Sequence, residues 1–177
     1  AKLGLVRVAL SVTSLDQELT RVLEPRTSSP AARLRAIHEL SQAGIPTVVM
    51  TSPMIPGLND SEMPAILKAA SEAGAQFATY ILVRLPLTVQ PVFMEWLERC
   101  LPSKRELIES RIRATRDGQL NSSEFGERMR GTGPIAQQID QTFKVFAKRY
   151  GLNGKYEPLD ASLFRPPKPS SGQLRLF

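Results

Sequence analysis

The sequence is poor in the residues that most often carry out chemistry. It contains one cysteine, Cys100, and one histidine, His38. One thiol cannot build a disulfide framework or a protein-only cysteine cluster, and one Cys with one His leaves no plausible zinc site and no Cys–His dyad. His38 falls within an expected helix, away from the loops that follow the strands, so a role as general base is not expected. No metal-ligating residue is expected in this chain.

Two further absences narrow the class of protein. The chain has neither a P-loop nor a GxGxxG motif, the two common phosphate-binding glycine loops. It has no signal peptide and no apolar run of 18 residues, so we expect a cytoplasmic protein without membrane association.

The composition is that of a globular protein with a basic surface. Hydrophobic residues make up 42% of the 177 residues, which permits a real core in one domain of ordinary size or in a piece of a larger one. The net charge of +6 is compatible with binding to DNA, but it is equally compatible with simple solubility. The chain begins AKLGLVRVALSV, without Met and almost directly in an expected strand, so we expect it to be part of a longer protein.

An internal repeat predicts the fold. LSQAG at Leu40–Gly44 and ASEAG at Ala70–Gly74 lie 30 residues apart, and each closes a helical pattern with a glycine. Expected strands at Val6–Val12, Ile45–Met50 and Gln76–Val83 alternate with these helices, which is typical of βα units and a parallel sheet.

Local signals predict the helices. Ser29-Pro30 is an N-cap with proline at the first helical position, and Asn59–Glu62 offers caps for the next helix. A third helix is expected at about Pro91–Leu101, and Ser103-x-x-Glu106 reads as a capping box for a fourth that ends near Gly118. A last helix is expected at Pro134–Tyr150, with a proline-rich, mobile tail after it. We therefore divide the chain into βα units (1–102), a helical extension (103–154) and a tail (155–177).

Three βα units do not close a barrel, since a complete eight-unit barrel takes roughly 250 residues. The chain is either a small open α/β sheet or the second half of a barrel, and its abrupt start favours the second. Ligands of parallel α/β structures bind beyond the carboxyl ends of the strands, which selects three loops.

The first loop, Ser11–Arg26, carries candidate binding groups. Ser11 and Thr13 lie near the strand tip, where hydroxyls could hold a ribose or a carboxylate, and Arg26 could bind a carboxylate through two hydrogen bonds. The alternative is a helical turn with a side-chain cap and a surface ion pair.

The second loop, Thr51–Asp60, reads TSPMIPGLND. Gly57 permits close backbone approach, and Met54 and Ile55 could face a purine ring. The alternative is a strand-to-helix connector that is rich in turn residues.

The third loop follows the last strand and begins at Arg84. An arginine at the carboxyl end of a central strand favours an anion, so Arg84 is our candidate substrate contact. The alternative is an arginine that reaches solvent from the rim.

Four segments together resemble one family. SVTSLDQELTRVLEPRTSSPAARLRAI, AGIPTVVMTSPMIPGLND, YILVRLP and EFGERMRG look like the C-terminal half of radical S-adenosylmethionine (SAM) proteins, in the group similar to spore photoproduct lyase. The resemblance covers most of the stretch from Val6 to Gly154.

The resemblance implies a partial (βα)6 barrel that binds SAM and a [4Fe-4S] cluster and forms a 5′-deoxyadenosyl radical. It places Ser11 and Thr13 on a strand that contacts the ribose and methionine. It also places Ile55, Gly57 and Asn59 beside the adenine, with Leu85 near its ring. Arg26 is the residue we expect at the SAM carboxylate.

The chain departs from this family in one respect. The CxxxCxxC loop that holds the cluster is missing, and Cys100 lies in a helical pattern where it looks structural. The resemblance therefore implies that residues before Ala1 hold the cluster and that this piece alone is inactive.

A second resemblance lies at the C-terminus. Gln173, Leu174, Leu176 and Phe177 match the bacterial sliding-clamp-binding peptide Gln-Leu-(Ser/Asp)-Leu-Phe, with a departure at Arg175. The alternatives are a chance match and packing back on the domain. Residues 99–130 carry eight Lys/Arg against five Asp/Glu, which fits a solvated helical face or a phosphate-contacting surface.

Two functions follow as expectations. The first is the SAM-binding portion of a radical SAM enzyme, a lyase-like protein that acts on DNA in repair. The second is a module without chemistry that binds DNA or the sliding clamp.

Overall fold

The computed structural model describes residues 3–155, 158–162 and 165 of the chain. Three strands, β1 (Val8–Ser11), β2 (Thr47–Met54) and β3 (Phe77–Leu82), form one parallel sheet in the order β1-β2-β3. The predicted α/β class and parallel strands are confirmed. Within the described residues the sheet is open, and its place in a partial (βα)6 barrel stays a prediction.

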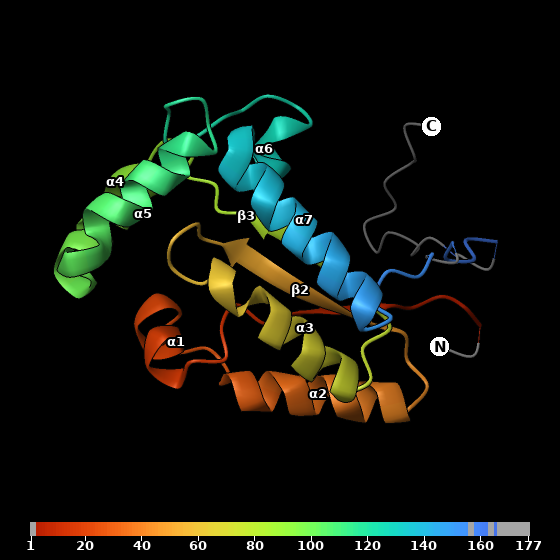
Figure 1. The fold of residues 1–177 in the computed structure, drawn as a ribbon. Helices are drawn as coiled ribbons and strands as arrows, with labels where there is room; N and C mark the ends of the chain where they lie inside the picture. The colour runs from red at the N-terminus through yellow and green to blue at the C-terminus, as the bar shows by residue number, and fades with distance from the viewer. Residues whose placement is uncertain (1–2, 156–157, 163–164, 166–177) are drawn as a thin grey trace, which may run out of the picture.

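Helices follow each strand (Figure 1). They are α1 (Gln17–Leu23), α2 (Pro30–Gln42), the short 3-10 turn η1 (Asp60–Glu62), α3 (Met63–Glu72), α4 (Val89–Cys100), the 3-10 turn η2 (Pro102–Lys104), α5 (Arg105–Ala114), α6 (Glu127–Arg130) and α7 (Gly133–Arg149). In the part of the chain that the structure describes, no helix combines the length and apolarity needed to cross a membrane.

The start of α2 is as predicted, and two other predicted caps are wrong. Ser29 accepts a hydrogen bond from the backbone N–H of Ala32, and Pro30 is the first helical residue. Neither η1 nor α3 has a side-chain cap, although Asn59–Glu62 offered several. The capping box at Ser103 is also absent, because η2 begins at Pro102 and holds Ser103 inside a helical turn, where a cap needs extended backbone.

Strand β2 is longer than predicted. It ends at Met54, four residues beyond the predicted Met50, so the first residues of TSPMIPGLND belong to the sheet. The pairing with β3 shifts register between Thr51 and Met54. Pro53 lies inside this shift, and proline is tolerated in a sheet at such irregular positions because it has no N–H to donate.

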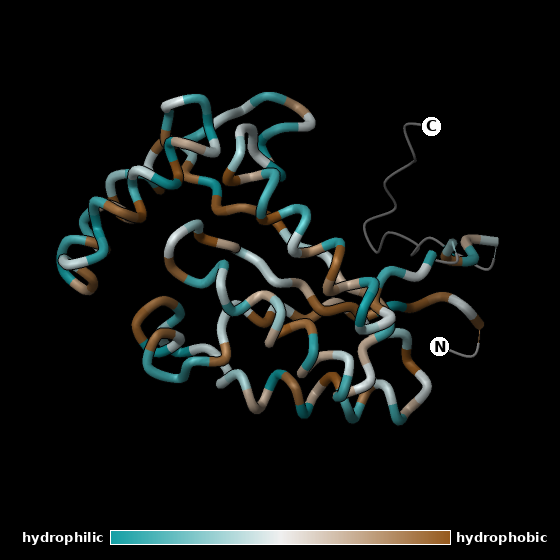
Figure 2. Tube along the Cα trace, in the orientation of Figure 1, coloured by the Kyte–Doolittle hydropathy of each residue, from teal (hydrophilic) through white to brown (hydrophobic). Residues whose placement is uncertain are grey.

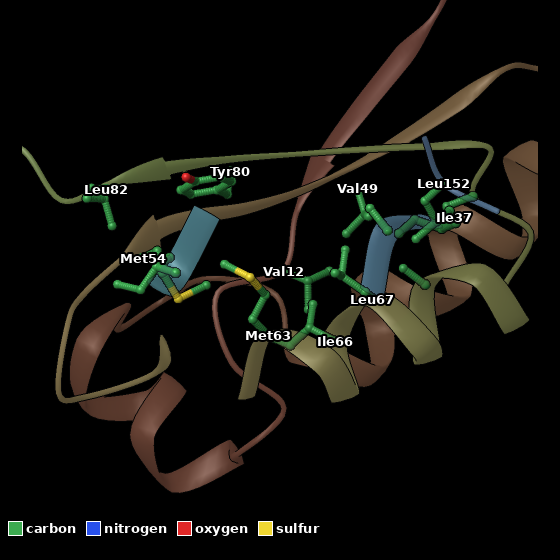
Figure 3. Packing of buried hydrophobic residues seen from close by; sticks show 14 of the residues in the cluster. Val12, Ile37, Val49, Met54, Met63, Ile66, Leu67, Tyr80, Leu82 and Leu152 are labelled. Carbon is green, nitrogen blue, oxygen red and sulfur yellow. The ribbon is translucent and has the colours of Figure 1, made fainter. Parts of the chain in front are cut away.

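The main core lies between the sheet and the helices α2, α3 and α7 (Figure 3). Its members are buried side chains of the strands, the loop after β1, the three helices and the segment after α7, among them Val12, Ile37, Val49, Met54, Met63, Ile66, Leu67, Tyr80, Leu82, Ile139 and Leu152. Because α7 contributes Ile139 to this core, the helical extension predicted for 103–154 packs against the βα units. Figure 2 shows apolar and polar residues alternating along α5 and α7, as expected of helices with one buried face.

A second core lies at the carboxyl end of the sheet. It joins side chains of α4 and α5 to residues that follow β2 and β3, namely Ile55, Leu58, Val83, Leu85, Leu97, Ile108, Ile112 and Leu120. Figure 1 shows α4 and α5 on the side toward which the arrow of β2 points. The two helices thus cover part of the region where ligands of parallel sheets bind.

The tail predicted for 155–177 falls mostly outside the described residues. All four residues of the predicted clamp motif, Gln173, Leu174, Leu176 and Phe177, lie there, so sliding-clamp binding stays a prediction.

Candidate functional site

In the part of the chain that the structure describes, one face of the sheet carries no helix of the main core. Side chains alternate between the two faces of a strand, and Val12, Val49, Tyr80 and Leu82 all point into the main core. Ser11, Met50 and Thr79, which are cross-strand neighbours in register, therefore point to the opposite side, and all three are partly exposed. We name this side the open face and define it by Ser11, Met50, Ser52, Thr79 and Ile81.

The open face is polar at its carboxyl end. It carries the hydroxyl-bearing residues Ser11, Ser52 and Thr79 beside the apolar side chains of Met50 and Ile81. The Ser52 hydroxyl oxygen is buried and has no hydrogen-bond partner among the described residues. Buried polar atoms are nearly always paired, so this hydroxyl is an exception to that pattern.

An all-parallel sheet is normally covered on both faces. Here α2, α3 and α7 pack on one face only, and Ala9 at the edge strand is exposed on the other. The open face is therefore the natural position for a ligand or for further polypeptide.

The loop after β1 is organised by a three-residue network. Thr13 is buried and donates its hydroxyl hydrogen bond to Glu24 over 3.0 Å. Arg33 forms an ion pair with the same Glu24 at 2.8 Å and donates to the backbone oxygen of Ser11 at 3.1 Å. In the structure the Thr13 hydroxyl is thus hydrogen-bonded to Glu24, and the backbone oxygen of Ser11 on β1 is hydrogen-bonded to Arg33.

Arg33 was not among the residues predicted from the sequence, although its position early in the helix after the first loop could have indicated it. It lies in the first turns of α2, directly beside the tip of β1. The predicted carboxylate ligand Arg26 lies instead in an exposed turn with a positive φ of 70° and forms no ion pair with any described residue. It lines a surface hollow with Thr20 and Pro30, away from the open face.

Asn59 ties the first two loops together. It is fully buried, and its side-chain oxygen accepts from the Ile55 backbone N–H at 2.7 Å. Its side-chain nitrogen donates to the backbone oxygens of Thr13 at 2.8 Å and Pro53 at 3.1 Å. Asn59 therefore fixes the relative position of the tips of β1 and β2.

Glu62 adds a second tie from η1. Its carboxylate accepts from the Ser14 hydroxyl at 2.7 Å and from the Leu15 backbone N–H at 2.8 Å. The polar side chains around η1 thus satisfy the loop after β1, which explains why they do not cap α3.

Gly57 and Ile55 face α4 and α5. Gly57 has a positive φ of 86°, and a side-chain carbon there would lie 2.9 Å from Cδ of Arg111. Ile55 and Leu85, each about 1% exposed, pack in the second core. Their predicted contacts with an adenine ring stay predictions, and in the structure their side chains contact other apolar residues.

Arg84 follows β3 and is partly buried. It lies beside Arg116, a second arginine that the sequence analysis did not single out. His38 is exposed on α2.

The open face is built for binding rather than for proton transfer. None of its five residues is an acid or a base. In the described ranges, no group of three or more His, Cys, Asp or Glu side chains could hold a metal ion. Cys100 lies on α4, where it borders an apolar hollow with Val22 and Trp96.

Comparisons with known proteins find a similarity in the first part of the chain and three relatives. Residues 1–70 match the model of the radical SAM superfamily. Three curated relatives, one from Mycobacterium bovis and one from each of two strains of Mycobacterium tuberculosis, are 33% identical over 155 residues, and each is described as an uncharacterized protein. The match covers 86% of this chain and 42% of each relative, so the chain spans well under half of the relatives' length. No solved structure matches the chain.

Proposed function

We propose that this chain forms the SAM-binding wall of a radical SAM enzyme. The observation that carries the proposal is the family match over residues 1–70, which includes β1 and β2 and so Ser11, Met50 and Ser52 of the open face. In this proposal the chain is the carboxyl-terminal part of the enzyme, with its strands continuing a partial barrel.

The open face fits SAM in its chemistry. SAM combines a ribose diol with an apolar purine face. The hydroxyls of Ser11 and Thr79 can donate to and accept from a diol, and Met50 and Ile81 offer apolar contact beside them. When SAM is bound next to a [4Fe-4S] cluster, this family cleaves it reductively to a 5′-deoxyadenosyl radical.

The same residues do not fit the cluster. Three cysteines hold it in this family, and this chain has only Cys100. We therefore assign to this chain the holding and orienting of SAM, with the cluster ligands outside it. The loop ties made by Asn59 and Glu62 keep the strand tips in a fixed position, which is the condition for a preorganised site.

For the substrate we propose DNA, with a lyase-like repair reaction. The support is the sequence resemblance to the spore photoproduct lyase-like group and the net charge of +6. Of the SAM contacts predicted from the sequence, only Ser11 lies on the open face, whereas Thr13 and Asn59 hydrogen-bond within the loops that hold the strand tips. The predicted contacts of Ile55, Gly57, Leu85 and Arg26 with SAM stay predictions.

The test uses the full natural protein, purified and reconstituted without air. We expect iron–sulfur absorbance, and we expect 5′-deoxyadenosine when SAM and a strong reductant are added. Absence of both signals in a folded sample would end the proposal.

A matched pair of variants tests the open face. Thr79→Val removes one hydroxyl from the open face, whereas Thr51→Val removes one from the fully buried opposite face of the neighbouring strand. We expect SAM affinity to fall about tenfold in Thr79→Val, the usual cost of one lost hydrogen bond, and to stay unchanged in Thr51→Val. Equal SAM affinities in both variants, measured by equilibrium dialysis, would place SAM elsewhere.

A further inference from the structure

Arg84 lies in a backbone segment that is fixed on both sides. The backbone oxygen of Val83 accepts a hydrogen bond from Arg116 at 3.0 Å, and the backbone N–H of Leu85 donates to the side-chain oxygen of Asn121 at 3.2 Å. Val83 and Leu85 are both buried in the second core. The backbone of Arg84 is therefore held in a fixed position at the carboxyl end of β3.

The Arg84 side chain has no protein partner in the described residues. Its Nε atom is buried without a hydrogen bond, and no carboxylate lies within ion-pair distance of its guanidinium. The side chain is only partly exposed, so solvent does not fully replace the missing partner.

Arg116 places a second positive charge near Arg84. Arg116 is 3% exposed, and its guanidinium donates to three backbone oxygens, those of Val83, Glu127 and Arg128. These partners are neutral, so they fix the position of the Arg116 guanidinium but do not neutralise its positive charge. Burial lowers the pKa of Arg116, and the charge of Arg84 lowers it further, which reports that the two guanidinium groups repel each other.

Two other partly buried arginines are paired with acids, namely Arg33 with Glu24 at 2.8 Å and Arg113 with Glu109 at 2.8 Å. Arg105 on α5 is partly buried without such a pair among the described residues, and its Nε atom is also unpaired there. Arg84 and Arg116 differ from Arg105 in that the two arginines lie next to each other. Two adjacent uncompensated cations are costly in a partly buried site unless an anion joins them.

We propose that Arg84, backed by Arg116, binds a phosphate dianion at the carboxyl end of β3. A phosphate monoester or free phosphate carries close to two negative charges at neutral pH, which matches two guanidinium groups better than a carboxylate does. Arg84 supplies the direct fork of N–H donors, whereas the buried Arg116 acts through its charge and by fixing the backbone. Asn121 lies next to this point through its bond to Leu85 and can add its side-chain N–H₂ as a donor.

This site does not depend on the proposed SAM function. It is defined by Arg84, Arg116 and Asn121, none of which belongs to the open face, and its ligand can be tested without SAM or a cluster. Failure of phosphate binding therefore leaves the SAM proposal standing, and the reverse holds as well.

The experiment measures phosphate binding by the full natural protein with Arg84→Gln, using Arg35→Gln as the control. Arg35 is exposed on α2, so its replacement removes the same charge from a remote surface. The probes are inorganic phosphate, phenyl phosphate as a monoester and dimethyl phosphate as a diester, each titrated at constant ionic strength by calorimetry. We expect saturable binding of the two dianions, at least tenfold weaker binding in Arg84→Gln, and unchanged binding in Arg35→Gln.

Three results would overturn the proposal. One is the absence of dianion binding to the wild-type protein, and another is equal binding by wild type and Arg84→Gln. The third is a clear fall in the melting temperature of Arg84→Gln without ligand, since it would show that Arg84 has a structural partner. We expect that melting temperature to stay the same or rise, because the repulsion from Arg116 is removed. Preference for the diester over both dianions would likewise contradict the assignment to a dianion.

Discussion

The two faces of the sheet carry different kinds of residue on the same three strands. On the covered face, Val49, Tyr80 and Leu82 are at most 1% exposed and pack against α2, α3 and α7. On the open face, Ser11, Met50 and Thr79 stand in one cross-strand row and are partly exposed. One face forms the main core, and the other bears hydroxyls and a thioether.

The difference teaches why the open face is informative. Side chains on a covered face are chosen for volume and apolarity, because packing decides their contribution. A merely solvated surface would favour charged residues, yet Ser11, Met50, Ser52, Thr79 and Ile81 at the carboxyl end carry no charge. The Arg7 guanidinium lies over the Phe77 ring toward the other end of the strands. A small, uncharged, hydroxyl-bearing face is suited to an enclosed organic ligand.

The largest predicted effect is a loss of stability when a core side chain of the covered face is truncated. Ile66→Ala removes a fully buried side chain of α3 and leaves a cavity in the main core. We expect a loss of about 3 kcal/mol in the free energy of unfolding. Met50→Ala on the open face is the control and should cost less than about 1.5 kcal/mol, because that side chain is partly exposed already. Urea denaturation measures both, and equal losses would mean that the open face is as tightly packed as the covered one.

The next effect concerns the polar tie between the tips of the strands. Asn59→Ala leaves one buried N–H and two backbone oxygens, those of Thr13 and Pro53, without their partner. We expect a loss of about 2–4 kcal/mol, since each unsatisfied buried group costs about 1–3 kcal/mol. Asn153→Ala, an exposed change, should stay within about 0.5 kcal/mol. A loss below 1 kcal/mol for Asn59→Ala would show that the loops are ordered by the second core alone.

The smallest predicted effect concerns the hydrogen bond between the covered face and α7. Tyr80 is fully buried and donates its hydroxyl hydrogen bond to Asp140 on α7 at 3.0 Å. Burial acts to raise the pKa of Asp140, but hydrogen bonds from Lys144 and Tyr80 outweigh it, so this pKa lies below its ordinary value.

Such a shift gives stability that is present above the unfolded-state pKa of about 4 and is lost as the pH falls through the lower folded-state pKa. Asp140→Asn should therefore make the free energy of unfolding fall less steeply between pH 5 and pH 2. We expect a loss of less than about 1 kcal/mol at pH 7, because the Asp140–Lys144 pair lies near the surface. A pH profile identical to that of the wild type would show that the pKa of Asp140 is not lowered in the folded protein.

Much of the fold was readable from local signals. The 30-residue repeat predicted all three strands within a few residues, since a glycine that ends a helix and an apolar run that follows it are local features. Ser29-Pro30 predicted the start of α2 for the same reason. The capping box at Ser103 failed because Pro102 initiated a 3-10 turn one residue earlier, and β2 ran to Met54 because pairing with β3 continued past the apolar run.

The site was readable only in part. Ser11 and the loop containing Asn59 were selected correctly as neighbours at the carboxyl edge, because that edge follows from a parallel sheet. The roles of Arg33 and Arg116 were not visible, since each depends on a partner 22 or 33 residues away. The position of Ser52 was not visible because it depends on the face to which a strand residue points. Ile55 and Leu85 were apolar residues in the right loops, but their burial under α4 and α5 depends on how those helices pack.

The sequence by itself determined the βα alternation, the parallel sheet and the impossibility of a three-cysteine cluster in this chain, because these depend on periodicity, turn residues and composition. Tertiary structure alone decided which face of the sheet stays uncovered, that Asn59 joins two loops, and that Arg84 meets Arg116 without an acid between them. Those features depend on distances between residues that are remote in the chain, and packing of the helices against one face of the sheet sets those distances.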